Sequence, residues 1–460
     1  MRKIVLAVFL FFSTVLRAFA VPATGEIIEM PAKPEQGFQW GYVIYLPKTM
    51  DTSKPLPILF VMNNNGSYST QEENIKSVLA RFQKRSGDLV EYGIADGVGV
   101  PMVMPMVLRE ELPQNEPQFL YSHELNRAIF VLKDGPYARL DLQALAMLKD
   151  ARKQLKQRQI RTQKKFLIAG FSAAGAFGNR FALLHPERVL AVATGGDHYP
   201  PLPFETYNGV PLIFPTGAYD METYTGKKFN KRAWLQIPIF ISEGGEDYND
   251  PLPYEDTFGD EDRAVVLQVL GEGTGVDRWE RVREILAASA PNVQTHTYPN
   301  TEHFWAKQDV IDFLNAHKKG GPLKPITPTD TSDRPSNFPI RVTKLYWGDE
   351  AKKELTPDLH QYMREREVYM RVEGDNSLPH WVDNITCAVD VLYQGNVVIE
   401  NKRCASAQFQ DTTHHFNLQA IRLTEEEWAA LKKTGGRTFS LRTYYPRIWD
   451  VPEDLTFTIP

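Results

Sequence analysis

The chain is poor in cysteine, has no basic cluster and has no long apolar run after its first twenty residues. Only two of its 460 residues are cysteines, and nothing in the sequence places a general base beside either, so we expect no cysteine nucleophile. The formal net charge is −5 without a long basic stretch, which argues against a nucleic-acid partner. Because no later apolar stretch approaches the length of a transmembrane helix, we expect no membrane span.

Metal and cofactor signatures are missing as well. The sequence contains no His-Glu-x-x-His spacing and no phosphate-binding glycine loop. His414 and His415 are adjacent on an expected strand, where neighbouring side chains point to opposite faces and cannot easily share an ion. We therefore expect neither a metal nor a cofactor.

The first twenty residues predict a signal peptide. Arg2 and Lys3 precede an apolar run of 13 residues, and Ala18-Phe19-Ala20 is a small-x-small cleavage site before Val21. The run is short for a membrane anchor, although an uncleaved anchor is the alternative. We expect residues 1–20 to be removed and the mature protein to be secreted or periplasmic.

The length predicts two domains, because 460 residues exceed what one hydrophobic core usually takes. Residues 319–339 contain five prolines, and two adjacent glycines, Gly320 and Gly321, come before the first of them. This composition is typical of a linker. We expect a catalytic domain over 21–318 and a smaller accessory domain over 340–460. Period-two apolar patterns in the latter indicate a β-rich, sandwich-like fold.

The larger domain alternates strands and helices, which predicts an α/β fold with a doubly wound, mostly parallel sheet. Strands are expected at 26–30, 38–46, 56–62, 98–108, 166–169, 189–194, 237–242 and 293–298. Helices are expected at 70–85, 140–155, 173–184, 261–270, 279–288 and 305–317. Sites of such sheets lie at the carboxyl ends of strands, where four loops carry polar residues.

The loop after the strand at 166–169 holds the strongest signal. Gly170 allows a sharp turn, Ser172 stands at its apex, and the helix at 173–184 follows directly. A strand, a tight turn with a central serine and a helix together make a nucleophile elbow. The alternative is that Ser172 merely caps the helix.

A serine nucleophile needs a base and an acid that orients it. His303 follows the last expected strand and is our choice of base among ten histidines, while His198 is expected to line the pocket. Asp247 follows a Gly-Gly turn after the strand at 237–242, and Asp250 is the alternative acid. The order Ser, acid, His is the one that this architecture uses.

The oxyanion hole would use the backbone N–H of Ala173 and a second donor after the strand at 56–62. We choose Asn64, with Asn65 next, although the loop could be an ordinary turn. The segment 199–236 is rich in aromatic residues that include Trp234. They could line an acyl pocket or simply pack a cap against the core.

Cys387 and Cys404 flank an expected β-hairpin. A two-residue turn at Gly395-Asn396 pairs Gln394 with Val397, and the same register places the cysteines opposite each other. Their Cα atoms would lie about 4.5 Å apart, within disulfide range. We predict a disulfide, with two unpaired buried thiols as the alternative.

The chain resembles the α/β-hydrolase superfamily over about 38–317. The resemblance rests on Gly170-Phe171-Ser172-Ala173-Ala174 as the elbow, Asp247 as the acid and His303 as the base. Within the superfamily the chain is similar to secreted esterases of the polyhydroxybutyrate-depolymerase and dienelactone-hydrolase-like kind. Ala174 stands where glycine is usual, and 63–66 reads Asn-Asn-Asn-Gly where a His-Gly start is common.

This resemblance implies a secreted serine hydrolase that cleaves carboxylic esters, small or polymeric, through an acyl-enzyme. A serine peptidase of the same fold is one alternative. Another is a catalytically inactive binding or adhesion protein, in which the accessory domain holds a glycan or polymer ligand.

Overall fold

The computed structural model describes most of the chain from Gly25 onward. The described residues are 25–64, 76, 90–108, 122–247, 249–252, 257–299, 301, 303–329, 340–347, 367–373, 381–385, 388–403, 407–410, 415–443, 449–452 and 454–458. The expected signal peptide, Asn65 and both cysteines lie outside these residues, as does the expected helix at 70–85 apart from Lys76.

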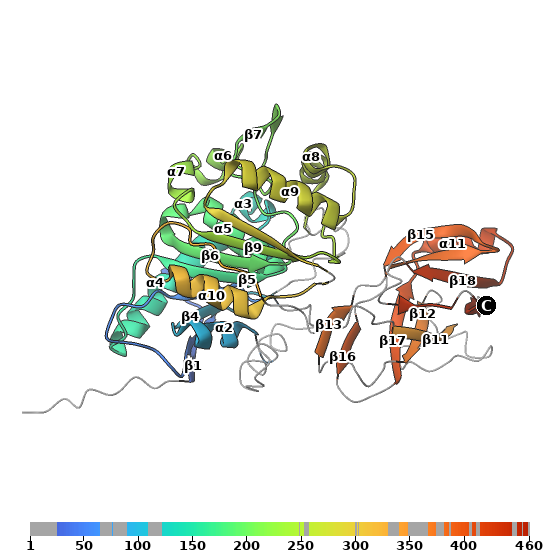
Figure 1. Cartoon of the computed structure of the whole chain (residues 1–460), viewed down its shortest axis with the longest axis horizontal. Helices are drawn as coiled ribbons and strands as arrows, with labels where there is room; N and C mark the ends of the chain where they lie inside the picture. Colours follow the sequence, from blue (N-terminus) through green and yellow to red (C-terminus); the bar gives the residue numbers. More distant parts are fainter. Residues whose placement is uncertain are drawn as a thin grey trace, which may run out of the picture.

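An eight-stranded sheet forms the centre of the N-terminal region (Figure 1). Its order is β1-β2-β4-β3-β5-β6-β9-β10. The strands are β1 (Glu26–Met30), β2 (Tyr42–Leu46), β3 (Leu59–Val61), β4 (Met102–Pro105), β5 (Phe166–Phe171), β6 (Val189–Gly195), β9 (Ile239–Gly244) and β10 (Val293–Tyr298). From β4 to β10 all neighbours are parallel, and only β1 and β2 join antiparallel. The mostly parallel α/β sheet expected from the sequence is confirmed.

Helices cover both faces of this sheet (Figure 1). They are α2 (Val90–Val98), α3 (Ala128–Val131), α4 (Leu140–Gln157), α5 (Ala173–Leu184), α6 (Met221–Thr225), α7 (Lys231–Trp234), α8 (Asp260–Leu270), α9 (Gly275–Ser289) and α10 (Lys307–His317). Three short 3₁₀ helices, Pro34–Gln36, Ser122–Glu124 and Pro186–Arg188, and a small hairpin of β7 (Thr206–Tyr207) and β8 (Val210–Pro211) complete the region.

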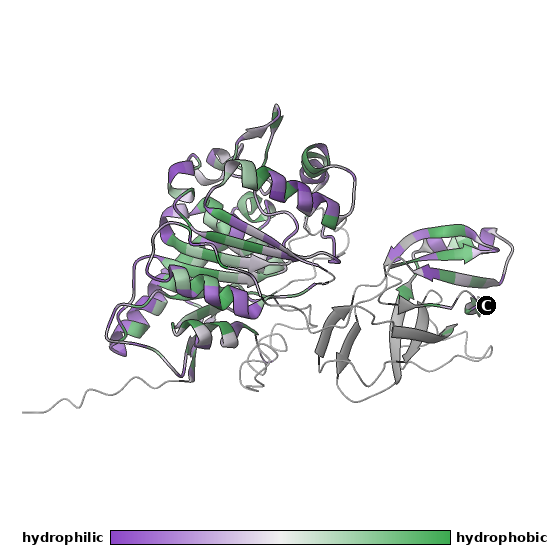
Figure 2. Cartoon of the chain, viewed as in Figure 1, coloured by the Kyte–Doolittle hydropathy of each residue, from purple (hydrophilic) through white to green (hydrophobic). Residues whose placement is uncertain are grey.

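Two hydrophobic clusters lie on opposite faces of the sheet. Alternate residues of one strand belong to different clusters: Phe60 packs with α4, α5 and α9, whereas Leu59 packs with α2 and α10. Such strands are apolar on both sides, as a parallel sheet covered by helices requires. Figure 2 shows apolar residues gathered along the strands and hydrophilic residues on the helices.

Helix α2 is the main element that the sequence did not predict. The strand expected at 98–108 is shorter, because Val98 ends α2 and Gly99, with φ +70°, turns the chain into β4. Gly97 permits close packing of α2 on α10, since a Cβ there would lie 2.7 Å from Cδ1 of Ile311. Glycine lowers helix propensity, which hid this helix in the sequence.

The C-terminal region is β-rich, as expected. Two four-stranded sheets run β17-β12-β11-β19 and β15-β14-β18-β20, and β13 pairs with β16. Bounds are β11 (Ile340–Trp347), β12 (Glu367–Glu373), β13 (Trp381–Ile385), β14 (Ala388–Tyr393), β15 (Asn396–Arg403), β16 (Ala407–Gln410), β17 (His415–Arg422), β18 (Thr438–Thr443), β19 (Trp449–Asp450), β20 (Thr456–Thr458) and helix α11 (Glu425–Lys433). Thr424 and Glu427 form a capping box at the start of α11.

The turn of the β14–β15 hairpin differs from the expectation. Tyr393 pairs with Asn396, so the two loop residues are Gln394 and Gly395, not Gly395 and Asn396. Both have positive φ, 48° and 79°, as a type I′ turn requires. Two register irregularities follow, and Ala388 then faces Arg403, the register expected at the hairpin base. The disulfide itself stays a prediction.

The first part of the expected linker is bound to the α/β region. The backbone N–H of Ile326 donates to the Gln294 side chain at 2.9 Å, and that of Thr329 donates to Asp309 at 3.0 Å. The proposed domain boundaries are not tested by these contacts. Among the described residues we find no helix with the length and apolar character needed to cross a bilayer.

The buried ion pair of Asp141 with Arg139 predicts that the stability of the protein depends on pH. Asp141, whose side chain is fully buried, accepts hydrogen bonds from Arg139 at 2.9 and 2.8 Å and is paired with His185 at 2.8 Å. Burial opposes ionisation of Asp141, but His185 and Arg139 outweigh it and lower the pKa of the carboxyl.

Asp141→Asn should therefore lower the free energy of unfolding by about 3 kcal/mol at neutral pH. A carboxyl with a lowered folded pKa stabilises above its unfolded value of about 4, and that stabilisation is lost as pH falls through the folded pKa. Urea unfolding at several pH values should show the gap between wild type and variant shrinking below pH ~4. A gap independent of pH would contradict this role.

Candidate active site

Four polar residues follow four neighbouring strands at one edge of the sheet. Ser172 follows β5, His198 lies after β6, Asp247 after β9 and His303 after β10. These strands are adjacent and parallel, so their carboxyl ends and the loops that follow meet at the same edge.

The backbone of Ser172 is held in a strained turn. Its φ of 57° and ψ of −133° lie in a backbone region that residues other than glycine rarely adopt. Its N–H donates to Gly195 O at 2.9 Å, and its carbonyl accepts from Gly175 N at 2.8 Å and Ala176 N at 3.0 Å. The hydroxyl makes no capping bond to α5, so the simple helix-cap role is not what the described residues show.

Two glycines allow the turn to close. A Cβ on Gly170 would lie 2.2 Å from Ala174 O, and one on Gly175 would lie 2.9 Å from Gly195 O. Ala174 itself is buried in the hydrophobic core, so alanine fits where the resembling family usually has glycine. Glycine at 170 and 175 is therefore a steric requirement of this elbow.

The structure joins His303 to Asp247. Nδ1 of His303 lies 2.7 Å from Oδ2 of Asp247, whose side chain is fully buried. The His303 ring packs against Phe171 with centroids 4.4 Å apart, and a Cβ on Gly196 would lie 2.9 Å from its Cε1. His303 thus lies beside the residue that precedes Ser172.

The structure does not join Ser172 to His303. Within the described ranges no hydrogen bond links the Ser172 hydroxyl to the imidazole. Nε2 of His303 instead lies 3.5 Å from Nδ2 of Asn249, a residue that the sequence did not single out. Catalytic hydrogen bonds are often long before substrate binds, so this geometry leaves Ser172 a candidate.

Asp250, the alternative acid, has other partners. Its Oδ1 accepts from the Tyr199 hydroxyl at 2.5 Å and from Leu252 N at 3.0 Å, and its Oδ2 is bound by Arg278 of α9. The structure therefore places Asp247, rather than Asp250, beside the base candidate.

The two residues expected to form an oxyanion hole lie at the start of α5 and in the loop after β3. Ala173 is the first residue of α5, and its N–H has no acceptor among the described residues. Asn64 is exposed in the loop that follows β3. Its neighbour Asn63 is buried and exchanges hydrogen bonds of 2.7 and 3.2 Å with the backbone of Val107, which fixes the start of the loop.

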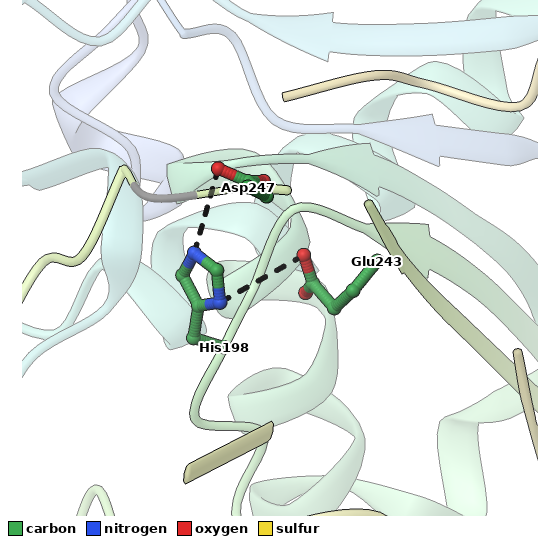
Figure 3. A group of neighbouring side chains, drawn as sticks. All are labelled: His198, Glu243 and Asp247. Atoms are coloured by element: carbon green, nitrogen blue, oxygen red, sulfur yellow. Dashed lines mark ion pairs between the residues drawn. The ribbon is translucent and has the colours of Figure 1, made fainter. Parts of the chain in front are cut away.

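His198 is buried under Asp247 and is only 1% exposed (Figure 3). Nε2 lies 3.6 Å from Oδ1 of Asp247, and Nδ1 lies 4.0 Å from Oε2 of Glu243. His198 was expected in the pocket lining, and it lies instead beneath Asp247 beside Glu243, which the sequence marks only as an acid before a Gly-Gly pair at the end of an apolar strand. Trp234, the other pocket candidate, is buried in the hydrophobic core.

Burial and charge act against each other in this group. Burial opposes a charged His198, but Glu243 and Asp247 outweigh it and raise the pKa of the ring to about 9. Burial raises the pKa of Glu243 well above its usual value, with His198 opposing. Burial would also raise the pKa of Asp247, yet His303 and His198 lower it below its usual range.

The same three side chains offer potential metal-ligand atoms within 4.8 Å of one another. Figure 3 shows, however, that the two ring nitrogens of His198 face different carboxylates. A single ion beside one nitrogen would leave the other facing an unligated carboxyl group, so the geometry suits an ion-paired ring better than a metal centre.

No family model and no curated protein matches the sequence. Solved structures do, at low identity. A poly(aspartic acid) hydrolase from Sphingomonas sp. KT-1 has 15% identity over 65% of this chain and 100% of its own, with a TM-score of 0.42. A poly(3-hydroxybutyrate) depolymerase from Bordetella parapertussis has 14% identity over 63% and 87%, with a TM-score of 0.39. An S-formylglutathione hydrolase from Agrobacterium tumefaciens has 14% identity over 64% of this chain and 92% of its own, with a TM-score of 0.33. Such weak similarity assigns no activity to this chain.

The strain at Ser172 can be measured with two matched variants. Ser172→Gly removes the side chain that disfavours this backbone conformation, a gain partly offset by glycine's greater freedom in the unfolded chain, so we expect a net gain of about 1 kcal/mol. Ser172→Ala keeps the Cβ and therefore the strain. Thermal unfolding should show Tm raised by about 2–4 °C in the glycine variant and little changed in the alanine variant. Equal Tm values for both would contradict the strained turn.

Proposed function

We propose that the protein is a serine hydrolase that cleaves carboxylic esters through an acyl-enzyme. The single observation that carries the proposal is the His303–Asp247 hydrogen bond of 2.7 Å beside a strained serine elbow, on neighbouring strand ends. A serine hydroxyl becomes a useful nucleophile only when an oriented base can take its proton.

In the proposed reaction, Oγ of Ser172 attacks the ester carbonyl while Nε2 of His303 takes the hydroxyl proton. Asp247 holds the ring through Nδ1 and stabilises the imidazolium that forms. The N–H of Ala173 donates to the oxyanion, with Asn64 as the proposed second donor. Collapse breaks the ester C–O bond, and His303 returns the proton to the leaving alkoxide. Water, activated by His303, then hydrolyses the acyl-enzyme and regenerates Ser172.

A fluorophosphonate probe tests this assignment directly. Wild type should be labelled and Ser172→Ala should not, with a loss of more than about 10³-fold in ester kcat/KM. Asp247→Asn should lose about 10⁴-fold in kcat, because the histidine is no longer held in the correct tautomer. Asp250→Asn tests the alternative acid: it breaks the ion pair with Arg278 but should keep a far larger share of kcat than Asp247→Asn. Equal labelling of wild type and Ser172→Ala would sink the proposal.

The substrate class is a finer question that a substrate panel answers. Aryl esters, polyesters and peptides offered to purified wild type separate an esterase from a peptidase of the same fold. If wild type cleaves none of them but binds a glycan or polymer through residues 340–460, the binding-protein alternative replaces the enzyme. The His303–Asp247 pair next to Ser172 favours the enzyme, because it would supply the oriented base that a serine nucleophile needs.

We also propose that the chain is exported and that Cys387 and Cys404 form a disulfide. The support is the signal-like segment 1–20 and the pairing of Ala388 with Arg403, one residue inside the two cysteines. Non-reducing peptide mapping of exported protein should recover the linked peptides, with an N-terminus near Val21. In the loop-entropy model, Cys387→Ser should cost about 3 kcal/mol of stability. Two thiols that alkylate without reductant would contradict the bond.

A further inference from the structure

Asn249 faces the reactive nitrogen of the base candidate. Its side-chain Nδ2 lies 3.5 Å from Nε2 of His303, the ring atom that Asp247 does not bind. The Asn249 side chain is partly exposed, as a group that meets substrate must be. The proposed reaction moves every proton through Nε2 of His303 and gives Asn249 no part, although this amide lies beside the atoms that react.

The segment that carries Asn249 is fixed on both sides. Its backbone N–H donates to Oδ1 of Asp247 at 3.0 Å. The next residue, Asp250, accepts from the Tyr199 hydroxyl at 2.5 Å and is bound by Arg278 of α9, and both of these partners are buried. Asn249 thus stands between two anchored carboxylates. A donor held in place in this way needs little reorganisation when charge develops next to it.

The tautomer of His303 decides which end of the amide faces the ring. An ionised carboxylate only accepts hydrogen bonds, so the 2.7 Å contact with Asp247 places the ring proton on Nδ1. Nε2 of the neutral ring then carries a lone pair and needs a donor, which is the NH₂ group of Asn249 and not its carbonyl. The contact is at the long limit of a hydrogen bond, so the amide can leave it easily.

Proton transfer to His303 changes this contact. Once Nε2 has taken the proton of Ser172, two donors face each other and the amide N–H has lost its acceptor. The next acceptor at this place is the leaving oxygen, because Nε2 delivers its proton there. Since Nδ2 and Nε2 lie 3.5 Å apart, one oxygen can lie within about 3 Å of both. Asn249 can therefore donate to that oxygen while its negative charge develops.

An oxygen can use both donors, whereas an amine nitrogen cannot. A departing alkoxide has several lone pairs, so it takes the proton from His303 and still accepts a hydrogen bond from Asn249. A departing amine has a single lone pair in the tetrahedral intermediate, and the proton from His303 uses it. A second donor at this point thus suits esters better than peptides. Its effect is largest for a strongly basic alkoxide, which carries the most negative charge as it leaves.

We propose that Asn249 is a catalytic residue that donates its side-chain N–H to the leaving oxygen, and that the site takes esters of aliphatic alcohols. In this step the ester C–O bond breaks, its electron pair stays on the oxygen, and the proton moves from Nε2 of His303 to that oxygen. Asn249 donates a hydrogen bond and transfers no proton. The inference rests on the proposed function and names its class of substrate.

Two acetate esters with different leaving groups test the proposal. Benzyl acetate releases a strongly basic alkoxide, whereas 4-nitrophenyl acetate releases a phenolate that leaves with little help. Asn249→Leu keeps nearly the size of asparagine but has no side-chain N–H. Its kcat/KM for benzyl acetate should fall by about 10- to 100-fold, the effect of losing one hydrogen bond to a charged group. The fall for 4-nitrophenyl acetate should be about threefold or less.

Asp250→Asn is the control for this comparison. It breaks the pair with Arg278 that anchors the same segment, and it leaves the amide of Asn249 in the chain. A purely structural disturbance of the segment should lower kcat/KM for both esters by similar factors. The same pattern in Asn249→Leu would make Asn249 a structural residue and would overturn the proposal.

A second variant covers the case in which Asn249→Leu does not fold, which thermal unfolding would reveal. Asn249→Ala also lacks the N–H and adds no bulk to the site. It should show the same selective loss on benzyl acetate, and an equal loss on both esters would again contradict the proposal.

Failure of this inference can be told apart from failure of the proposed function. If wild type neither hydrolyses esters nor reacts with the fluorophosphonate probe, the proposed function fails. If wild type is active and the Asn249 variants lose the same factor on both esters, only this inference fails. A gain in activity on both esters would also overturn it, because Asn249 would then be a cap that withholds Nε2 of His303 from Ser172.

Discussion

Close contact between helix α5 and the sheet is the constraint on which the candidate site depends. Gly170, Gly175 and Gly178 all lack the Cβ that would meet the neighbouring backbone or side chain. At Gly178 that atom would lie 2.8 Å from Ile168. With α5 this close, its first N–H groups lie directly behind Ser172, at the positive end of the helix dipole. The strained turn is thus a consequence of helix packing, and the packing is what aims the elbow at the sheet edge.

The second constraint is a buried negative charge. Asp247 is excluded from water and is stabilised by two rings and by the backbone N–H of Asn249 at 3.0 Å. A buried carboxylate of this kind orients a histidine well, because leaving its charge without a partner would cost several kcal/mol.

Much of the fold and the order of the candidate site residues could be predicted, because they depend on patterns that are local in the sequence. The strand β10 and the helix α5 match the expected bounds, and the order Ser172, Asp247, His303 placed the acid and base candidates at adjacent strand ends. Each of these depends on apolar runs and turn residues that are contiguous in the chain. The fold class followed from their alternation.

What the sequence could not show depends on tertiary packing. Helix α2 forms despite its glycines, because Gly97 lets it pack against α10. The buried ring of His198 lies next to the start of α9, 77 residues later in the chain, where a Cβ on Gly275 would be 3.5 Å from its Cε1. Distant partners of that kind leave no periodicity, so His198 could be placed near the site but not beneath it.

The segment that leaves α10 has a structural role of its own. β10 is the last strand of the eight-stranded sheet, and its open side would present unpaired backbone groups to any passing strand. The chain returns along this side, where Gln294 of β10 both donates to and accepts from the backbone of Ile326, at 2.8 and 2.9 Å. Residues 323–329 therefore belong structurally to the α/β region, and an α/β region cut at 318 would lose these contacts to β10 and α10.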